Sequence, residues 1–184
     1  MSTNIATRGY GSIAKTFHWL IAFLIVGQFV LANIAEGLPL GMQKIGVLAR
    51  HKSDGILILM LAVLRLAWRI GNTPPPPVAS LTRWQELASK TTHRLLYVLL
   101  FALPLSGWMM SSAKNYPVSF FGWFQLPNFI APSESAFKIL LAVHATLATT
   151  LLIIAGVHIS AALWHHFFKR DNVLRRMLPF AKPR

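Results

Sequence analysis

Residues 142–158 read AVHATLATTLLIIAGVH, a run with two histidines and no charged residue. The uncharged segment extends from 139 to 168, and a helix needs about 20 apolar residues to cross a bilayer. The sequence therefore predicts a membrane-spanning helix that carries an imidazole near each surface. An ionisable side chain inside a span is costly, so a functional role is the first hypothesis for both histidines.

Further apolar segments are predicted to cross the membrane beside this helix. Residues 16–35 and 95–113 contain no Asp, Glu, Lys or Arg, and a run from Gly55 to Trp68 is interrupted only by Arg65. The whole chain is 54% hydrophobic and 12% charged, whereas a soluble domain is about 25% charged. We expect one all-α membrane domain over residues 1–184. It is a four-helix bundle with spans near 16–35, 51–71, 93–113 and 139–168 and an outer cap loop at 114–137.

The basic residues predict the orientation of this bundle. Lys and Arg number 18 against 5 Asp and Glu, a net charge of +13. Most of the basic residues lie in the N-terminal segment, in the connection between the second and third spans, and in the C-terminal tail. The positive-inside rule places these segments, and so both termini, in the cytoplasm. This explains most of the charge without nucleic acid, and the absence of cysteine excludes disulfides and thiolate ligands.

The histidines fall at two levels of the predicted bundle. His144 and His158 are 14 residues apart, close to four turns, so they share a helix face at a separation of roughly 21 Å. His18 begins the first span at the cytoplasmic side, and His51 begins the second at the outer side. We therefore expect His18 to face His158, and His51 to face His144. The competing interpretation is that each imidazole only hydrogen-bonds a neighbouring helix.

Facing imidazoles in an apolar bundle favour haem. Haem iron takes axial nitrogen ligands, and bundles build cofactor sites from side chains on facing helices. Zinc is the competing metal, but it needs four ligands at one level and usually Cys or carboxylate among them. Haem propionates need cations, and we expect Arg50, Lys52 and Arg65 to supply them. The alternative is that these side chains reach towards lipid headgroups.

Several segments carry a family resemblance in order along almost the whole chain. They are FHWL at 17–20, RHKSDGILIL at 50–59, RLAWR at 65–69, THRLLYVLLFALPLSG at 92–107 and VHATLA…GVHISAALWHHFFKRDNVLRRMLP at 143–179. This ordered set resembles the bacterial cytochrome b561 family of dihaem membrane proteins. The resemblance implies two haems b on His18, His51, His144 and His158 in the bacterial inner membrane. It also implies electron exchange between a small periplasmic donor, superoxide in some members, and membrane ubiquinone.

Two more histidines lie at the predicted cytoplasmic level and are not needed as ligands. His93 begins the third span, and His165 follows His158 by seven residues. Reduction of a quinone consumes two protons, so we predict His93 and His165 as quinone-side residues. The alternative is that both anchor helix ends in the headgroups. Spacing alone also allows His93 to replace His18 as a ligand of the inner haem.

Three functional classes compete on this sequence. The leading hypothesis is a dihaem oxidoreductase similar to a superoxide:ubiquinone oxidoreductase. The second is a cytochrome b subunit that passes electrons to a partner protein and has no substrate site of its own. The third is a small transporter or channel in which the histidines carry protons, and such a protein would lack the visible absorption of haem.

Overall fold

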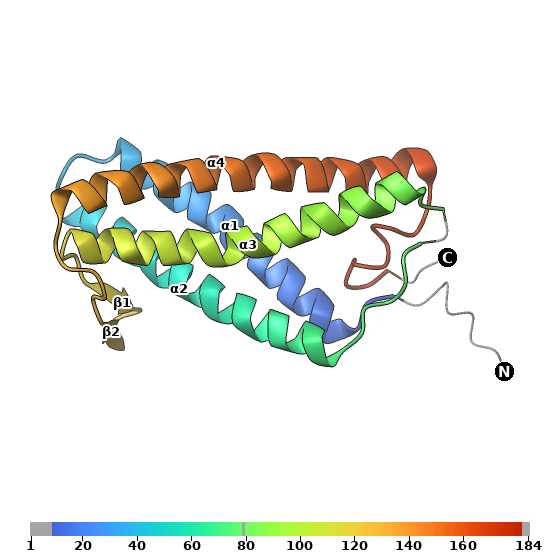
Figure 1. The fold of residues 1–184 in the computed structure, drawn as a ribbon, viewed down its shortest axis with the longest axis horizontal. Helices are drawn as coiled ribbons and strands as arrows, with labels where there is room; N and C mark the ends of the chain where they lie inside the picture. Colours follow the sequence, from blue (N-terminus) through green and yellow to red (C-terminus); the bar gives the residue numbers. More distant parts are fainter. Residues whose placement is uncertain (1–8, 79, 182–184) are drawn as a thin grey trace.

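The computed structural model is a bundle of long helices (Figure 1). It describes residues 9–78 and 80–181. The helices are α1 (Ser12–Gly37), α2 (Met42–Gly71), α3 (Arg83–Ala113) and α4 (Glu134–Trp164), and α4 continues into a π-helical turn, η2 (His165–Lys169). The start of α1, the α2–α3 connection and the C-terminal tail lie at one end of the bundle, here called the terminal end (Figure 1). The α1–α2 connection and a small β-hairpin lie at the other, the hairpin end.

The helices pack in the order in which they follow along the chain. α1 packs on α2, α2 on α3 and α3 on α4, whereas α1 and α4 make no comparable contact within the described residues. One core cluster joins Ile21 of α1, Ile58 of α2 and Leu100 of α3. Outward-facing apolar side chains stay exposed, as for Phe23 (76%) and Val26 (63%). A protein in water rarely exposes such extended apolar surface, so the pattern suits lipid.

Three helices are long and apolar enough to cross a membrane within the described part of the chain. They are α1, α3 and the continuous segment formed by α4 and η2. Helix α2 has sufficient length, 30 residues, but Asp54, Arg65 and Arg69 interrupt its apolar part. The support for α2 as the fourth span is therefore its position, since it packs between α1 and α3.

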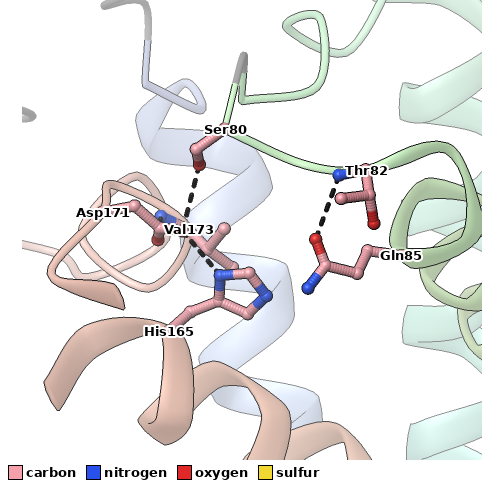
Figure 2. Close-up of polar contacts among 6 residues, drawn as sticks. All are labelled: Ser80, Thr82, Gln85, His165, Asp171 and Val173. Atoms are coloured by element: carbon pink, nitrogen blue, oxygen red, sulfur yellow. Dashed lines mark hydrogen bonds and ion pairs between the residues drawn. The ribbon is translucent and has the colours of Figure 1, made fainter. Parts of the chain in front are cut away.

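The helices extend beyond the predicted spans because hydropathy marks only their apolar parts. Helix α2 begins at Met42 rather than near residue 51, since Gln43, Lys44 and Arg50 break the apolar run of its first turns but are compatible with a helix. Helix α3 begins after Thr82, which forms a capping box with Gln85 (Figure 2). Helix α4 begins at Glu134 after the N-cap Ser133, so residues 134–137 of the predicted outer loop are helical.

An antiparallel hairpin occupies part of the segment predicted as an outer cap. Strand β1 (Val118–Phe120) pairs with β2 (Phe124–Leu126), with Phe120 opposite Phe124. Val118 and Phe120 pack on Ile56 of α2. In Figure 1 the hairpin lies beside the start of α2 and is displaced sideways from the bundle.

Candidate functional site

The structure brings together the two predicted histidine pairs. His51 of α2 and His144 of α4 lie towards the hairpin end, with ring centroids 6.4 Å apart and ring planes at 75°. His18 of α1 and His158 of α4 lie towards the terminal end, with centroids 6.3 Å apart and planes at 72°. The role of these four side chains as metal ligands stays a prediction.

The spacing within each pair fits two imidazoles that coordinate one metal ion from opposite sides. Imidazole nitrogen binds a metal at about 2 Å, which places the centroids of two such rings about 6 Å apart. His51 Nδ1, like His166 Nδ1, is buried without a hydrogen-bond partner among the described residues. The described residues contain no group of three or more His, Cys, Asp or Glu able to hold a metal ion. Two imidazoles at each level therefore suit haem iron better than zinc.

Helix α3 fixes the orientation of the His144 ring. Ser106 Oγ donates to Leu103 O at 2.8 Å and lies 2.9 Å from His144 Nδ1. Because the hydroxyl has one hydrogen, the Nδ1–H of neutral His144 donates to Oγ and Nε2 keeps its lone pair for a metal. A Cβ at Gly107 would lie 3.1 Å from His144 Cε1, so the ring approaches α3 where a side chain is missing. Sequence reasoning assigned no role to Ser106 or Gly107, although a Ser-Gly pair inside an apolar span is a visible signal.

His158 has a second imidazole neighbour. The rings of His93 and His158 have centroids 5.2 Å apart and planes at 75°. This centroid distance is shorter than the 6.3 Å from His18 and departs from the 6.4 Å of the other pair. His93 Nδ1 also lies 3.4 Å from Ser89 Oγ, one turn earlier in α3. The geometry therefore favours His18 as the partner of His158 and places His93 beside that pair.

The cations predicted to bind propionates have different surroundings. Arg65 Nη2 lies 3.4 Å from His18 Nδ1. Lys52 donates to the carbonyl oxygen of Pro117 at 3.2 Å, and so contacts the outer loop. Arg50 is exposed at the hairpin end. Of these three cations, Arg65 is the one in contact with a candidate ligand.

His165, predicted on the quinone side, belongs to a polar network at the terminal end (Figure 2). The residue is only 8% exposed, and its Nδ1 lies 2.6 Å from Asp171 Oδ2. Asp171 also accepts hydrogen bonds from Ser80 Oγ at 3.2 Å and from the Val173 amide at 3.0 Å. The turn η2 begins at His165, and Arg170 ends it with a φ of 53°, which brings the following aspartate back to the ring. No role was assigned to Asp171 from the sequence. Its only signal there is that it is an acidic residue within a basic tail.

Histidine pairs between long apolar helices are what a membrane-bound b-type cytochrome requires. Comparison with known proteins agrees, because residues 9–180 match the family described as prokaryotic cytochrome b561. The chain belongs to this family of four-helix membrane proteins. It is thus a multi-pass membrane cytochrome of the bacterial inner membrane, and the family implies haem b as its cofactor.

Individual relatives are similar over nearly their whole length. Cytochrome b561 homolog 2 of Escherichia coli (strain K12) is 38% identical over 179 residues, which cover 96% of this chain and 94% of the relative. Cytochrome b561 homolog 1 of the same organism is 27% identical over 166 residues, covering 90% and 94%. The probable superoxide oxidase CybB of Yersinia pestis is 27% identical over 170 residues, covering 92% and 96%. Of these three, superoxide thus appears only in the name of the Yersinia pestis relative, which is less similar to this chain than homolog 2 is.

Proposed function

We propose that this protein is a dihaem cytochrome that moves electrons across the inner membrane from a periplasmic donor to ubiquinone. The main support is the presence of two histidine pairs at two levels of the bundle, with ring centroids 6.3 and 6.4 Å apart. Haem b, when bound, supplies reversible one-electron transfer at each level. His51 and His144 would hold one haem, and His18 and His158 the other.

The charge distribution supports a cytoplasmic terminal end. The described basic residues there are Lys15, Arg65, Arg69, Arg83, Lys90, Arg94, Lys169, Arg170, Arg175 and Arg176; Arg8, Lys182 and Arg184, which the sequence also assigns to the cytoplasm, lie outside the described residues. The hairpin end has Lys44, Arg50, Lys52, Lys114 and Lys138. By the positive-inside rule, the His51–His144 pair lies on the periplasmic side and the His165 network on the cytoplasmic side.

Arg65 is the candidate partner for a haem propionate near the terminal end. A guanidinium has only donors, so neutral His18 accepts at Nδ1 and carries its proton on Nε2 in the present contact. If His18 held a haem through Nε2, that nitrogen would be unprotonated and Nδ1 would carry the proton, so Arg65 would no longer pair with Nδ1. A carboxylate is a stronger partner for the guanidinium than an imidazole, which favours that exchange.

Superoxide is the donor supported by the name of one relative and by the exposed cations at the hairpin end. One relative is named a probable superoxide oxidase. Arg50 and Lys138 are exposed at the hairpin end, and exposed cations raise the local concentration of a small anion. The overall reaction balances: two superoxide anions, one ubiquinone and two protons give two dioxygen molecules and one ubiquinol. It requires no covalent bond to the protein.

The test of this function uses the purified protein without any partner. Superoxide generated in solution should reduce the haems, embedded ubiquinone should become ubiquinol, and superoxide dismutase should abolish both changes. Reduction by dithionite but not by superoxide would favour the cytochrome subunit that depends on a partner protein. A folded, colourless protein obtained with haem supplied would instead favour the proton-carrying transporter.

His165 is proposed to deliver a proton to the reduced quinone. Asp171 accepts from His165 Nδ1–H, so the aspartate is a positioning residue that orients the ring and fixes which nitrogen carries the proton. The carboxylate is itself held by two other donors, which keeps it from rotating away. His93 is the second candidate donor, since it lies at the same level beside His158.

Asp171→Asn is expected to slow ubiquinone reduction at least about tenfold, because the amide no longer holds the His165 ring in the tautomer and orientation that the carboxylate fixes. Stopped-flow measurement of haem reoxidation by ubiquinone across a pH series would report the rate. Haem content and spectra should not change. His166→Gln is the matched control, because this neighbouring imidazole lies outside the network. Unchanged rates at every pH would remove Asp171 and His165 from the proton path.

A further inference from the structure

The connection between α3 and α4 is uncharged after its first residue, Lys114. Residues 115–133 contain no Asp, Glu, Lys or Arg, although Lys114 and Glu134 flank them. The segment nevertheless exposes large aromatic side chains. These are Tyr116 (53%), Phe121 (44%), Trp123 (81%), Phe124 (53%) and Phe129 (51%). An exposed apolar surface of this kind marks an interaction site rather than a solvated loop.

The hairpin within this segment is held firmly against α2. Val118 is 1% exposed and Phe120 8% exposed, and both pack on Ile56. Ser53 of α2 donates to Ser119 O at 2.8 Å and accepts from the Phe121 amide at 3.1 Å. One face of the hairpin thus packs on α2 and forms hydrogen bonds with it. The aromatic side chains at the tip stay exposed.

The tip of the hairpin, residues 121–123, is a turn with a strained backbone. Phe121 has a φ of 51° and Gly122 a φ of 81°, and the Trp123 amide closes the turn on Phe120 O at 3.0 Å. The left-handed region is natural for glycine and unfavourable for a bulky aromatic residue. Strain of this kind persists where the surroundings over-determine it, and it often accompanies function. Here the turn exposes Phe121 and Trp123, which flank Gly122.

We propose that the hairpin tip inserts into the interfacial layer of the outer leaflet, as an anchor that lies in the membrane surface beside the bundle. The hairpin sits at the side of α2 near the helix ends (Figure 1). The ends of a spanning helix lie at the level of the phospholipid headgroups. Tryptophan and phenylalanine favour that layer, and the uncharged segment has no ionic group to desolvate there. α2 itself exposes Met60 and Val63 further along the span, where they meet the acyl chains.

The anchor is independent of the proposed electron transfer, and its test needs no activity. The chain has no cysteine, so Trp123→Cys provides a single site for an environment-sensitive fluorophore in the haem-loaded protein. Ser135→Cys is the control, since this exposed residue lies next to Glu134 in the first turn of α4. Both labelled proteins are placed in phosphatidylcholine nanodiscs, and unchanged haem spectra show that they are folded.

Phosphatidylcholine with a nitroxide near the top of its acyl chain should quench the label at residue 123 at least about twofold more than the label at 135. Aqueous iodide should show the reverse order. Quenching at 123 by iodide but not by the labelled lipid would overturn the proposal and indicate a surface for a water-soluble partner. Protection of 123 from both quenchers, together with two chains per nanodisc, would overturn it in favour of contact with a second copy.

Discussion

Replacing Gly107 with valine is expected to remove the haem that His51 and His144 are proposed to hold, while the haem proposed for His18 and His158 stays in place. A Cβ at this position already lies 3.1 Å from His144 Cε1, and the two further methyl groups of valine need the space that the ring fills. His144 can make room only by rotating away, and it then loses its bond to Ser106. The pyridine haemochrome assay should show one haem b per chain in place of two.

Two other variants show whether the loss comes from contact with the ring. Gly156→Val places the same side chain on the exposed face of α4, where no atom lies within 4 Å, so both haems should remain. Ser106→Ala removes only the acceptor of His144 Nδ1–H. It should keep both haems but raise one midpoint potential, because a less basic imidazole stabilises ferric iron less. Two haems with unaltered potentials in Gly107→Val would mean that His144 is not a ligand.

The pairing of the histidines was accessible to sequence reasoning because it depends on simple geometry. Helical periodicity fixes His144 and His158 on one face, and the alternation of spans fixes the level of His18 and His51. The structure has these four rings together as two pairs. Sequence spacing could not decide between His18 and His93, since both begin a span at the same level. That choice depends on how α1 and α3 approach α4.

The features that sequence reasoning missed depend on local backbone geometry. Asp171 reaches His165 only because a π-helical turn and a left-handed Arg170 reverse the chain, and neither has a hydropathy signature. The hairpin has strands of three residues, too short for an alternating pattern to be recognised. The early start of α2 was missed for a different reason. Its first turns contain Lys44 and Arg50, and these charges set them apart from an uncharged apolar run although a helix accommodates both residues easily.

His18→Ala and His93→Gln should show which histidine shares a haem with His158 and which only lies beside it. In His18→Ala, the haem at the terminal end should be lost or become high-spin, and electron transfer to ubiquinone should fall to background. In His93→Gln, both haems should remain low-spin, and only the rate of quinone reduction should fall. The expectation follows from the ring spacings to His158, since 6.3 Å leaves room for a metal ion between the rings and 5.2 Å is shorter than such an arrangement needs.

Optical spectra of the oxidised and reduced variants, with a haem count per chain, decide between the two histidines. His51→Ala is the matched control, because it should remove the haem at the other level and leave the His158 haem low-spin. The opposite result, with a low-spin pair in His18→Ala and a lost haem in His93→Gln, would make His93 the ligand. His18 would then be free to keep its contact with Arg65, and α3 rather than α1 would supply the inner haem. Because α3 already packs on α4, that arrangement would place the haem nearer to the α3–α4 interface than to α1.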